Sequence, residues 1–321
     1  MNEYLLTNNK GLSLTVSSFG AGVRSLSLNG KKLILELNRE QDYEDNSMYF
    51  GKTLGRVCGR TEKNVLIGEE NFELLVGADN LALHGGEEKS FSYKDFESKL
   101  NATRETKSVI FSYLSKDLEN GYPGNLQVSV TYTLFENENK FSISFKAKTD
   151  RKTIVNLSNH IYWAINDKGL DEQYLYVDSS IMNSFQSDTL LIDGQRNVTD
   201  EYNFMTMSPL KEKLDSIVDS SRLKTLDNTF IFNHGIIEDL PRVILTDKKI
   251  KVSCFTNYEA CNIYTDLTKN PFSFANGKEF TTMDRRAIAI EPQKFIKDNL
   301  VLNPNEEYNK YIIYKVEEEQ I

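Results

Sequence analysis

The stretch LQVSVTYTL, residues 126–134, decides the fold, because every second residue in it is apolar over nine positions. A polar segment follows at 136–139, and the alternation then resumes in FSISFKA at 141–147. Successive side chains of a strand point to opposite faces of a sheet. Two such runs with a short polar connection therefore predict an antiparallel hairpin with one buried face.

Other strand-like runs occur along the whole chain, whereas helical periodicity is scarce. One short helix is expected at 208–218, with Ser208 as its N-cap and Pro209 at its first position. Turn signals separate many of the runs, at Asn29-Gly30, Asp193-Gly194, Asn276-Gly277 and Asn303-Pro304. The further expected strands span 12–16, 23–28, 33–37, 109–114, 175–177, 243–245, 251–255, 287–290 and 311–316.

Many short strands with almost no helices predict an all-β protein, a large antiparallel β-sandwich with few short helices. At about 150 residues per domain the length of 321 residues would allow two domains. No change of composition marks a linker, and no repeat or low-complexity tract occurs. We therefore expect a single domain over residues 1–321.

Composition and charge restrict the function classes. Hydrophobic residues make up 39% of the chain, which is enough for a sizeable core. The net charge of −9 and the absence of a basic patch argue against nucleic acid and anionic membranes as partners. No apolar run approaches the roughly 18 residues of a membrane span, and the first residues lack the pattern of a signal peptide.

The cysteine pattern predicts a cytoplasmic protein. The chain has three cysteines and no CxxC motif, which fits a reducing compartment. Each cysteine is expected to be a small buried side chain. They are Cys58, Cys254 and Cys261.

Three histidines are the first candidates for chemistry. His84 precedes Gly85-Gly86, where a backbone with little steric bulk allows a ligand to approach. His160 lies in a polar segment beside the single tryptophan, and polar groups next to aromatic faces suit a sugar. His234 precedes a glycine in what resembles a strand-ending turn. For each of them an ordinary structural role is the alternative.

Among the carboxylates, Glu291 stands out because it ends the apolar run at 287–290 and precedes Pro292-Gln293. Partial burial there would raise its pKa and keep it competent as a base near neutral pH. A solvent-facing strand end is the alternative. Asp227 is a weaker candidate, since a turn before a strand explains it equally well. No metal-binding spacing and no glycine-rich phosphate loop occurs, so neither a metal nor another cofactor is expected.

Seven segments, taken in order, resemble the aldose 1-epimerase (galactose mutarotase) family across nearly the whole chain. They are GRVCGR (55–60), LHGG (83–86), GYPGNL (121–126), NLSNHIYW (156–163), LDNTF (226–230), NIYT (262–265) and EPQ (291–293). The resemblance implies the family's large β-sandwich, which agrees with the strand pattern.

The resemblance also implies the reaction, the interconversion of the α and β anomers of an aldohexose without a cofactor. A cyclic hemiacetal opens when its anomeric hydroxyl loses a proton and its ring oxygen gains one, so one base and one acid suffice. By resemblance Glu291 is the base and His160 the acid. Each such group typically supplies about 10²–10⁴-fold in rate.

The remaining matches are expected to hold the sugar. His84 is similar to a second family histidine, and Arg60 and Asp227 resemble residues that hydrogen-bond hydroxyls. Two positions depart from the family's pattern. Gly59 stands where many members have asparagine, and Asn262 stands where many have glutamine. The acid and base are thus retained while the residues that read the sugar are altered.

Three alternatives remain beside a mutarotase. A hexose-6-phosphate 1-epimerase would need an extra cationic pocket for the phosphate. A sugar-binding protein without turnover would keep the pocket alone. A glycosidase would use Glu291 and Asp227 as a carboxylate pair. The preferred sugar and the oligomeric state are left open by the sequence.

Overall fold

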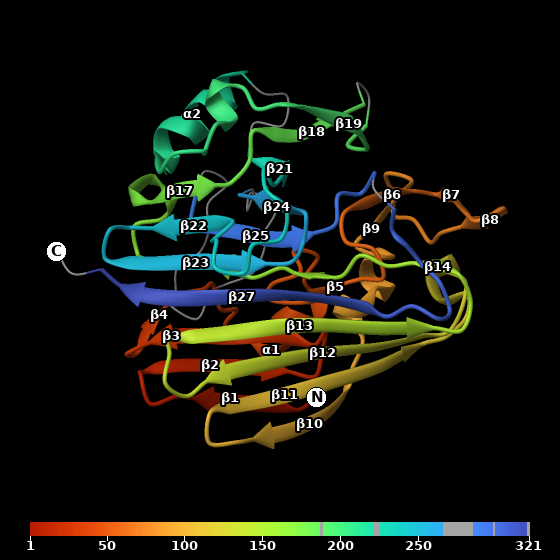
Figure 1. Cartoon of the computed structure of the whole chain (residues 1–321), viewed down its shortest axis with the longest axis horizontal. Helices are drawn as coiled ribbons and strands as arrows, with labels where there is room; N and C mark the ends of the chain where they lie inside the picture. Colours follow the sequence, from red (N-terminus) through yellow and green to blue (C-terminus); the bar gives the residue numbers. More distant parts are fainter. Residues whose placement is uncertain (187–188, 221–224, 266–284, 298, 320–321) are drawn as a thin grey trace.

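A nine-stranded antiparallel sheet forms the largest layer of the protein (Figure 1). The structure is a computed structural model, and it describes residues 1–186, 189–220, 225–265, 285–297 and 299–319. The strands of this sheet are, in spatial order, β10 (Glu97–Ala102), β11 (Thr106–Ser115), β12 (Leu126–Phe135), β13 (Lys140–Thr149), β27 (Tyr308–Glu318), β23 (Ile250–Thr256), β22 (Val243–Thr246), β17 (Tyr174–Val177) and β20 (Ser208–Pro209).

The expected hairpin lies in the middle of this sheet. β12 and β13 pair antiparallel with Val130 opposite Phe145, and both side chains are fully buried. Along β12 buried residues alternate with partly or fully exposed ones, as the period-two pattern predicts. The predictions for both strands are confirmed.

Two smaller sheets cover the buried face of the large one. The six-stranded sheet has the order β16 (Tyr162–Trp163), β25 (Ile288–Gln293), β24 (Ala260–Tyr264), β21 (Asp227–Ile231), β18 (Ile181–Phe185) and β19 (Ile192–Asn197). The four-stranded sheet has the order β1 (Glu3–Thr7), β2 (Leu12–Ser17), β3 (Gly22–Leu28) and β4 (Lys31–Lys32). Leu14, Val130 and Ile290, one from each sheet, belong to the same hydrophobic core cluster. The fold is thus the all-β sandwich that the sequence predicts.

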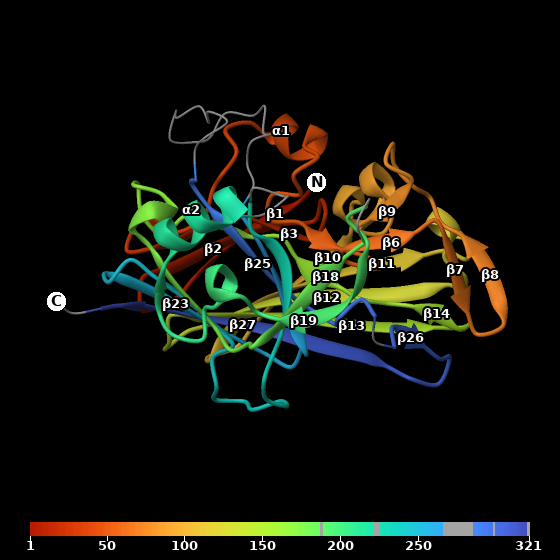
Figure 2. The ribbon, with the colours of Figure 1, turned by 90° about the horizontal axis from the view of Figure 1, so that it is seen from above.

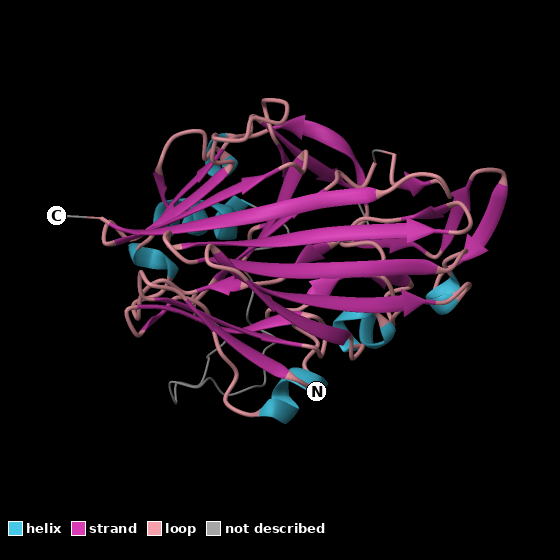
Figure 3. Cartoon of the chain, turned by 60° about the horizontal axis from the view of Figure 1, so that its bottom comes forward, coloured by secondary structure: helices cyan, strands magenta, loops and turns pink. Residues whose placement is uncertain are grey.

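Short strand pairs and helices complete the structure. The pairs are β5 (Thr53–Leu54) with β15 (Ser158–Asn159), β6 (Arg60–Glu62) with β9 (Leu81–Leu83), β7 (Asn64–Ile67) with β8 (Glu70–Glu73), and β14 (Thr153–Ile154) with β26 (Val301–Leu302). The helices are α1 (Glu40–Asp45), α2 (Leu210–Ser220) and the 3₁₀ turns Glu87–Lys89, Phe91–Tyr93, Glu119–Gly121, Leu170–Glu172 and Asp200–Tyr202. Helices occupy the periphery, and strands fill the interior (Figure 3). β18 and β19 cross over the long strands, and β6–β9 lie at one end of them (Figure 2).

Two secondary-structure predictions need correction, the strand expected at 33–37 and the first residues of the helix expected at 208–218. The segment 33–37 forms no continuous strand, because its backbone bonds alternate between Leu26 and Tyr162 in two different sheets. The expected helix begins at Leu210, since Ser208-Pro209 is extended and pairs with β17. Ser208 therefore does not cap the helix, and its hydroxyl donates to the Thr206 carbonyl instead (2.8 Å).

The turn predictions have mixed outcomes. Asn29-Gly30 connects β3 to β4, and both residues have positive φ. Asn303-Pro304 also lies in a turn, closed by the Glu306 N–H donating to the Asn303 carbonyl (3.0 Å). Asp193-Gly194 lies inside β19, where the irregular pairing with β18 accommodates an extra residue. Asn276-Gly277 lies outside the described residues.

Candidate active site

Three adjacent strands of the six-stranded sheet build one wall of a cavity. In their register Thr229 on β21 lies opposite Asn262 on β24, which lies opposite Glu291 on β25. Residues two positions apart in a strand share a face, so each strand adds a second side chain to the wall. The resulting set of polar and aromatic residues is Asp227, Thr229, Asn262, Tyr264, Glu291 and Gln293, and all six line the cavity.

Glu291 lies inside β25, not at the end of the strand as the sequence suggested. The strand continues to Gln293, and every residue in it is buried. The Glu291 neighbour Ile290 faces the hydrophobic core, which leaves the carboxylate on the cavity side. The side chain of Glu291 is only 2% exposed.

His160 approaches Glu291 from the segment between β15 and β16. Its backbone is fixed to the 51–52 segment, since its N–H donates to the Lys52 carbonyl (2.9 Å) and its carbonyl accepts from Gly51 N–H (2.8 Å). The His160 Nε2 atom lies 3.4 Å from Glu291 Oε1, and both side chains are at most 5% exposed. The rings of Tyr49 and Tyr162 pack against the imidazole at centroid distances of 6.2 and 4.7 Å. The pair is therefore held in place by packing.

His84 follows β9 with a positive φ of 50°. Its N–H donates to the Gly59 carbonyl (2.9 Å), and the Gly59 N–H donates to His84 Nδ1 (3.2 Å). An acceptor role at Nδ1 leaves the ring proton on Nε2 in the neutral imidazole. His84 therefore offers an N–H donor to the cavity that it lines.

Arg60 and Asp227 connect β6 to the six-stranded sheet. Arg60 Nη2 lies 3.0 Å from Asp227 Oδ2, with side-chain exposures of 23% and 8%. This ion pair raises the pKa of Arg60. The Asn262 amide lies between the two carboxylates, 3.3 Å from Asp227 Oδ1 and 3.4 Å from Glu291 Oε1. The shorter side chain at position 262 thus still reaches the acidic groups as a hydrogen-bond donor.

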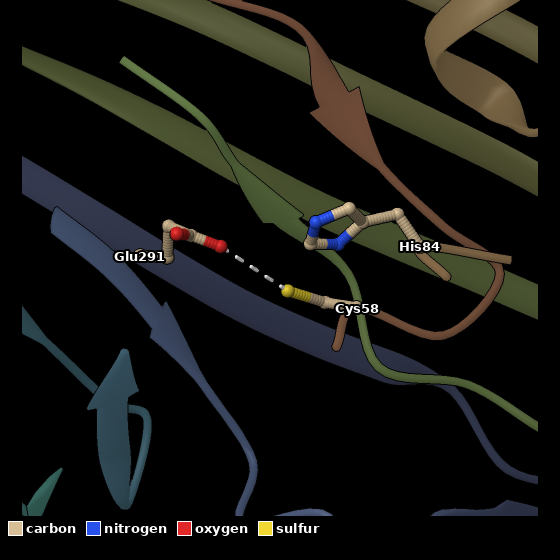
Figure 4. Close-up of side chains that lie close together, drawn as sticks. All are labelled: Cys58, His84 and Glu291. Carbon is tan, nitrogen blue, oxygen red and sulfur yellow. Dashed lines mark hydrogen bonds between the residues drawn. The ribbon is translucent and has the colours of Figure 1, made fainter. Parts of the chain in front are cut away.

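Cys58 brings a thiol to the same carboxylate, as Figure 4 shows. Its S–H donates to Glu291 Oε2 over 3.8 Å, and possible ligand atoms of Cys58, His84 and Glu291 all lie within 4.8 Å of one another. Burial, and then Glu291, raise the pKa of the Cys58 thiol well above its ordinary value. A metal would need the thiolate, so the contact fits a thiol donor to the carboxylate better than a metal ligand. The sequence spacing gave no sign of this cluster.

Burial dominates the electrostatics of the site. It raises the pKa of Glu291 to about 8, with the Asp227 charge acting in the same direction. Burial lowers the pKa of His160 to about 3, and it also lowers the pKa of His84 well below its ordinary value. Near neutral pH the Glu291–His160 pair therefore holds one proton, which lies on the Glu291 carboxyl group.

The structure brings the sequence-predicted site residues into one cavity. Its lining includes His84, His160, Arg60, Asp227, Asn262 and Glu291. His234 lies outside this cavity, where its half-exposed ring contacts Asp178 at 3.1 Å. Sequence reasoning missed the aromatic and apolar part of the lining, which comprises Met48, Tyr49, Leu83, Tyr162, Phe185, Leu190, Ile192, Tyr264 and Ile296. These residues have no chemical signature of their own, and only the fold brings them together.

Comparison with known proteins places this β-sandwich, with its buried carboxylate–imidazole pair, in a class of carbohydrate-converting enzymes. The model of the family described as "Aldose 1-epimerase" matches residues 2–315. The chain belongs to the aldose 1-epimerase family, whose members are isomerases that act on small sugars.

Individual relatives and structures agree with this placement. A maltose epimerase of Levilactobacillus brevis is 27% identical over 314 residues, covering 91% of this chain and 86% of the relative. An aldose 1-epimerase of Streptococcus thermophilus is also 27% identical, with the same coverage of both chains. The crystal structure of a galactose 1-epimerase from Lactobacillus acidophilus has a TM-score of 0.88 at 25% identity, covering 99% of this chain and 95% of its own. Among the described residues, no helix has the length and apolar character to cross a membrane.

Proposed function

We propose that the chain interconverts the α and β anomers of a neutral aldohexose by ring opening, with Glu291 as general base and His160 as general acid. The observation that carries the proposal is the buried contact between Glu291 Oε1 and His160 Nε2 at 3.4 Å. The anomeric hydroxyl oxygen and the ring oxygen are bonded to the same carbon. Two proton-transfer groups this close together can reach both oxygens at once.

The proton balance of the reaction matches the protonation of the pair. In the reactive form Glu291 is ionised and the His160 imidazole is protonated. This form holds one proton in total, as does the form in which Glu291 is a neutral acid and His160 is a neutral imidazole. Glu291 accepts the hydroxyl proton while His160 gives its proton to the ring oxygen. The C1–O5 bond breaks, and a C1=O double bond forms. Rotation about C1–C2 and reversal of both transfers close the other anomer.

The other polar residues are proposed to position the sugar. Arg60 and Asp227 hold each other and offer charged hydrogen-bond partners to the hydroxyls. His84 offers its Nε2–H. A hydrogen-bond chain runs from Gln293 through Thr229 to Asn262, at 3.4 and 3.1 Å. It orients the Asn262 amide toward the carboxylates.

The cavity favours a neutral sugar over a hexose 6-phosphate. Arg60 is the cationic side chain in the described lining, and it is already paired with Asp227. A phosphate would add a charge of about −1.5 to −2 with no further cation to meet it there.

Polarimetry on freshly dissolved α-D-glucose and α-D-galactose tests the proposal. Wild-type protein is expected to speed the decay of optical rotation, and Glu291→Gln is expected to lose about 10²–10⁴-fold or more of that rate. Glu136→Gln is the matched control, since Glu136 is also buried but is paired with Lys107 outside the cavity. A Glu291→Gln variant with a near-wild-type rate would overturn the mechanism.

A second set of substrates separates the alternatives. Decay with glucose 6-phosphate but not with glucose would favour the phosphorylated substrate. Release of a new reducing end from a glycoside would identify a glycosidase, because an epimerase breaks no glycosidic bond. Sugar binding without faster decay for any substrate would identify a binding protein.

A further inference from the structure

The side chain of Gln293 brings a hydrogen-bond acceptor without a partner to the catalytic cavity. Gln293 is the last residue of β25, is 4% exposed and lines the cavity. Among the described residues, its Oε1 atom has no hydrogen-bond partner. Leaving a buried carbonyl oxygen without a hydrogen bond costs free energy. A donor on the bound sugar would supply the missing bond.

The direction of one hydrogen-bond chain determines which atom of the Gln293 amide lacks a partner. The Asp227 carboxylate, paired with Arg60, can only accept, so Asn262 has to offer it Nδ2 (3.3 Å). Asn262 Oδ1 then accepts from the Thr229 hydroxyl (3.1 Å), and the hydroxyl oxygen accepts from Gln293 Nε2 (3.4 Å). The chain therefore turns Nε2 toward Thr229 and leaves Oε1 as the atom without a partner.

Gly59 leaves space beside this oxygen. Among the described atoms, a Cβ built on Gly59 would have two neighbours within 4 Å, Gln293 Oε1 and Ile296 Cδ1, both at 3.9 Å. Gly59 also has a φ of +90°, which L side chains rarely adopt, so the backbone conformation favours glycine here. The space thus offers a ligand an acceptor from Gln293 and a methyl contact from Ile296.

The strand order indicates which carbon of the sugar faces this space. β25 has β16 on one side and β24 on the other. His160 comes shortly before β16, whereas the Gln293 amide points across β24 to Thr229 on β21. The two ring neighbours of the anomeric carbon are the ring oxygen and C2. With the ring oxygen at His160, C2 lies on the side of Gln293 and Gly59.

We propose that Gln293 and Gly59 select an aldohexose that carries an acylamino group at C2, such as a 2-acetamido-2-deoxyhexose. This inference rests on the proposed function for the placement of C1 and the ring oxygen. The amide N–H of the sugar donates to Gln293 Oε1, and the acetyl group fills the space over Gly59 with its methyl against Ile296. A C2 hydroxyl would also bond to Oε1 but would leave that space and Ile296 uncovered. The reaction steps are unchanged.

Anomer exchange, measured by saturation-transfer NMR on sugars at equilibrium, compares substrates that differ in this group. The probes are glucose, 2-acetamido-2-deoxyglucose and 3-acetamido-3-deoxyglucose, each corrected for its exchange rate in buffer. The kcat/KM of the 2-acetamido sugar is expected to exceed that of glucose about tenfold, because a buried hydrogen bond and a methyl contact are added. The 3-acetamido sugar should show no gain. A 2-acetamido sugar that is no better than glucose, or a better 3-acetamido sugar, would overturn the inference.

Two variants test the two residues. Gly59→Asn fills the space with a side chain that tolerates positive φ better than most. Gln293→Met keeps the approximate size of the side chain and removes the acceptor. In each variant the ratio of kcat/KM for the 2-acetamido sugar to that for glucose is expected to fall about three- to tenfold. An unchanged ratio in Gln293→Met would overturn the inference, even if Gly59→Asn fails to fold.

Each variant has a matched control. Gly30→Asn also replaces a glycine of positive φ, +81°, but Gly30 lies in the turn between β3 and β4. Gln173→Met also replaces a buried glutamine whose Oε1 has no partner among the described residues, but Gln173 does not line the cavity. Both controls should leave the ratio unchanged. A ratio that falls equally in a variant and in its control would show a general structural effect and would overturn the assigned selection.

Failure of this inference and failure of the proposed reaction are distinguishable. Calorimetry with sugars at anomeric equilibrium measures binding without net reaction. Tighter binding of the 2-acetamido sugar than of glucose, lost in Gln293→Met and without any anomer exchange, would support the selection and overturn the reaction. Rapid exchange of glucose, with a 2-acetamido sugar that is neither bound nor converted better, would support the reaction and overturn the selection.

Discussion

The nine-stranded and the six-stranded sheet use their two faces differently. In β12 one face is buried in the core and the other is partly or fully exposed, so its polar side chains keep their contact with water. In β25 both faces are buried, one against the core and one against the cavity. Both sheets therefore contribute to the hydrophobic core, but the six-stranded sheet also holds carboxylates, amides and hydroxyls away from water on its other face. The comparison predicts that core substitutions in the nine-stranded sheet lower stability without lowering activity. Substitutions on the cavity face of the six-stranded sheet are expected to lower activity without lowering stability.

The largest loss of activity without a loss of stability is expected when His160, the proposed general acid, is replaced. His160→Gln should lower kcat/KM for mutarotation by about 10²–10⁴-fold, because it removes the proton donor to the ring oxygen. The fold should be retained, as judged by circular dichroism and the thermal midpoint. His234→Gln is the control, since His234 lies outside the cavity and is half-exposed. A His160→Gln protein with more than about a tenth of the wild-type rate would contradict the assigned role.

A loss of stability without a loss of activity is expected for a core substitution in the nine-stranded sheet. Phe145→Ala removes a fully buried ring that packs near Tyr258. It should lower the free energy of unfolding by about 3–5 kcal/mol in urea denaturation. The rate per folded molecule should not change. Ser144→Ala, on the other face of β13, should stay within about 0.5 kcal/mol of wild type. A rate loss in folded Phe145→Ala protein would show that the two sheets are not separable in this way.

Glu291→Gln should increase stability while it removes activity. Burial raises the folded-state pKa of Glu291 from 4.5 to about 8. Because the pKa of Glu291 is higher in the folded than in the unfolded state, the wild-type protein is most stable at pH values below the unfolded-state pKa of about 4.5. Its free energy of unfolding then decreases as the pH rises from about 4.5 to 8, where the unfolded state has released this proton and the folded state still binds it. The glutamine variant does not titrate and should be more stable at pH 8 by about 2–4 kcal/mol, with a smaller gap at pH 5. Urea denaturation at pH 5 and pH 8 measures the difference in the free energy of unfolding between the variant and wild type. A variant that is less stable than wild type at pH 8 would show that the buried Glu291 carboxylate does not destabilise the fold.

The smallest effect is a pH dependence of the rate. The Glu291–His160 pair is active with one proton, and it loses that proton above a pKa of about 8. The kcat/KM for glucose should therefore be flat near neutral pH and should fall about tenfold per unit above pH 8. Polarimetry between pH 6 and 10, corrected for the buffer rate, measures the profile. A rate that rises through pH 8 would mean that only the base has to be ionised.

Local pattern was sufficient for much of the fold. The alternation in 126–134 and 141–147 predicts β12 and β13 because one face of each meets the core and the other meets water. It fails at 33–37, where the chain passes from one sheet to another and its backbone bonds go to two partners. It also places Glu291 at a strand end, because a polar residue inside a strand buried on both sides breaks the expected pattern.

The site was predictable only where residues had a chemical signature. Histidine and carboxylate side chains led to His84, His160, Asp227 and Glu291. The resemblance to a known family added Arg60 and Asn262. Tyr49, Cys58 and Ile296 reach the cavity from distant parts of the chain. Their positions depend on tertiary packing, which the local sequence does not contain. The Thr229–Asn262–Glu291 row likewise depends on the register of three strands.

The position of β27 constrains how the protein is made. This strand pairs with β13 on one side and β23 on the other, so it joins the two halves of the nine-stranded sheet. Until residues 308–318 have left the ribosome, β13 and β23 both have unpaired edges that can associate with other chains. The large sheet is therefore completed only after β27 has been made, and both edges are open to association with other chains until then.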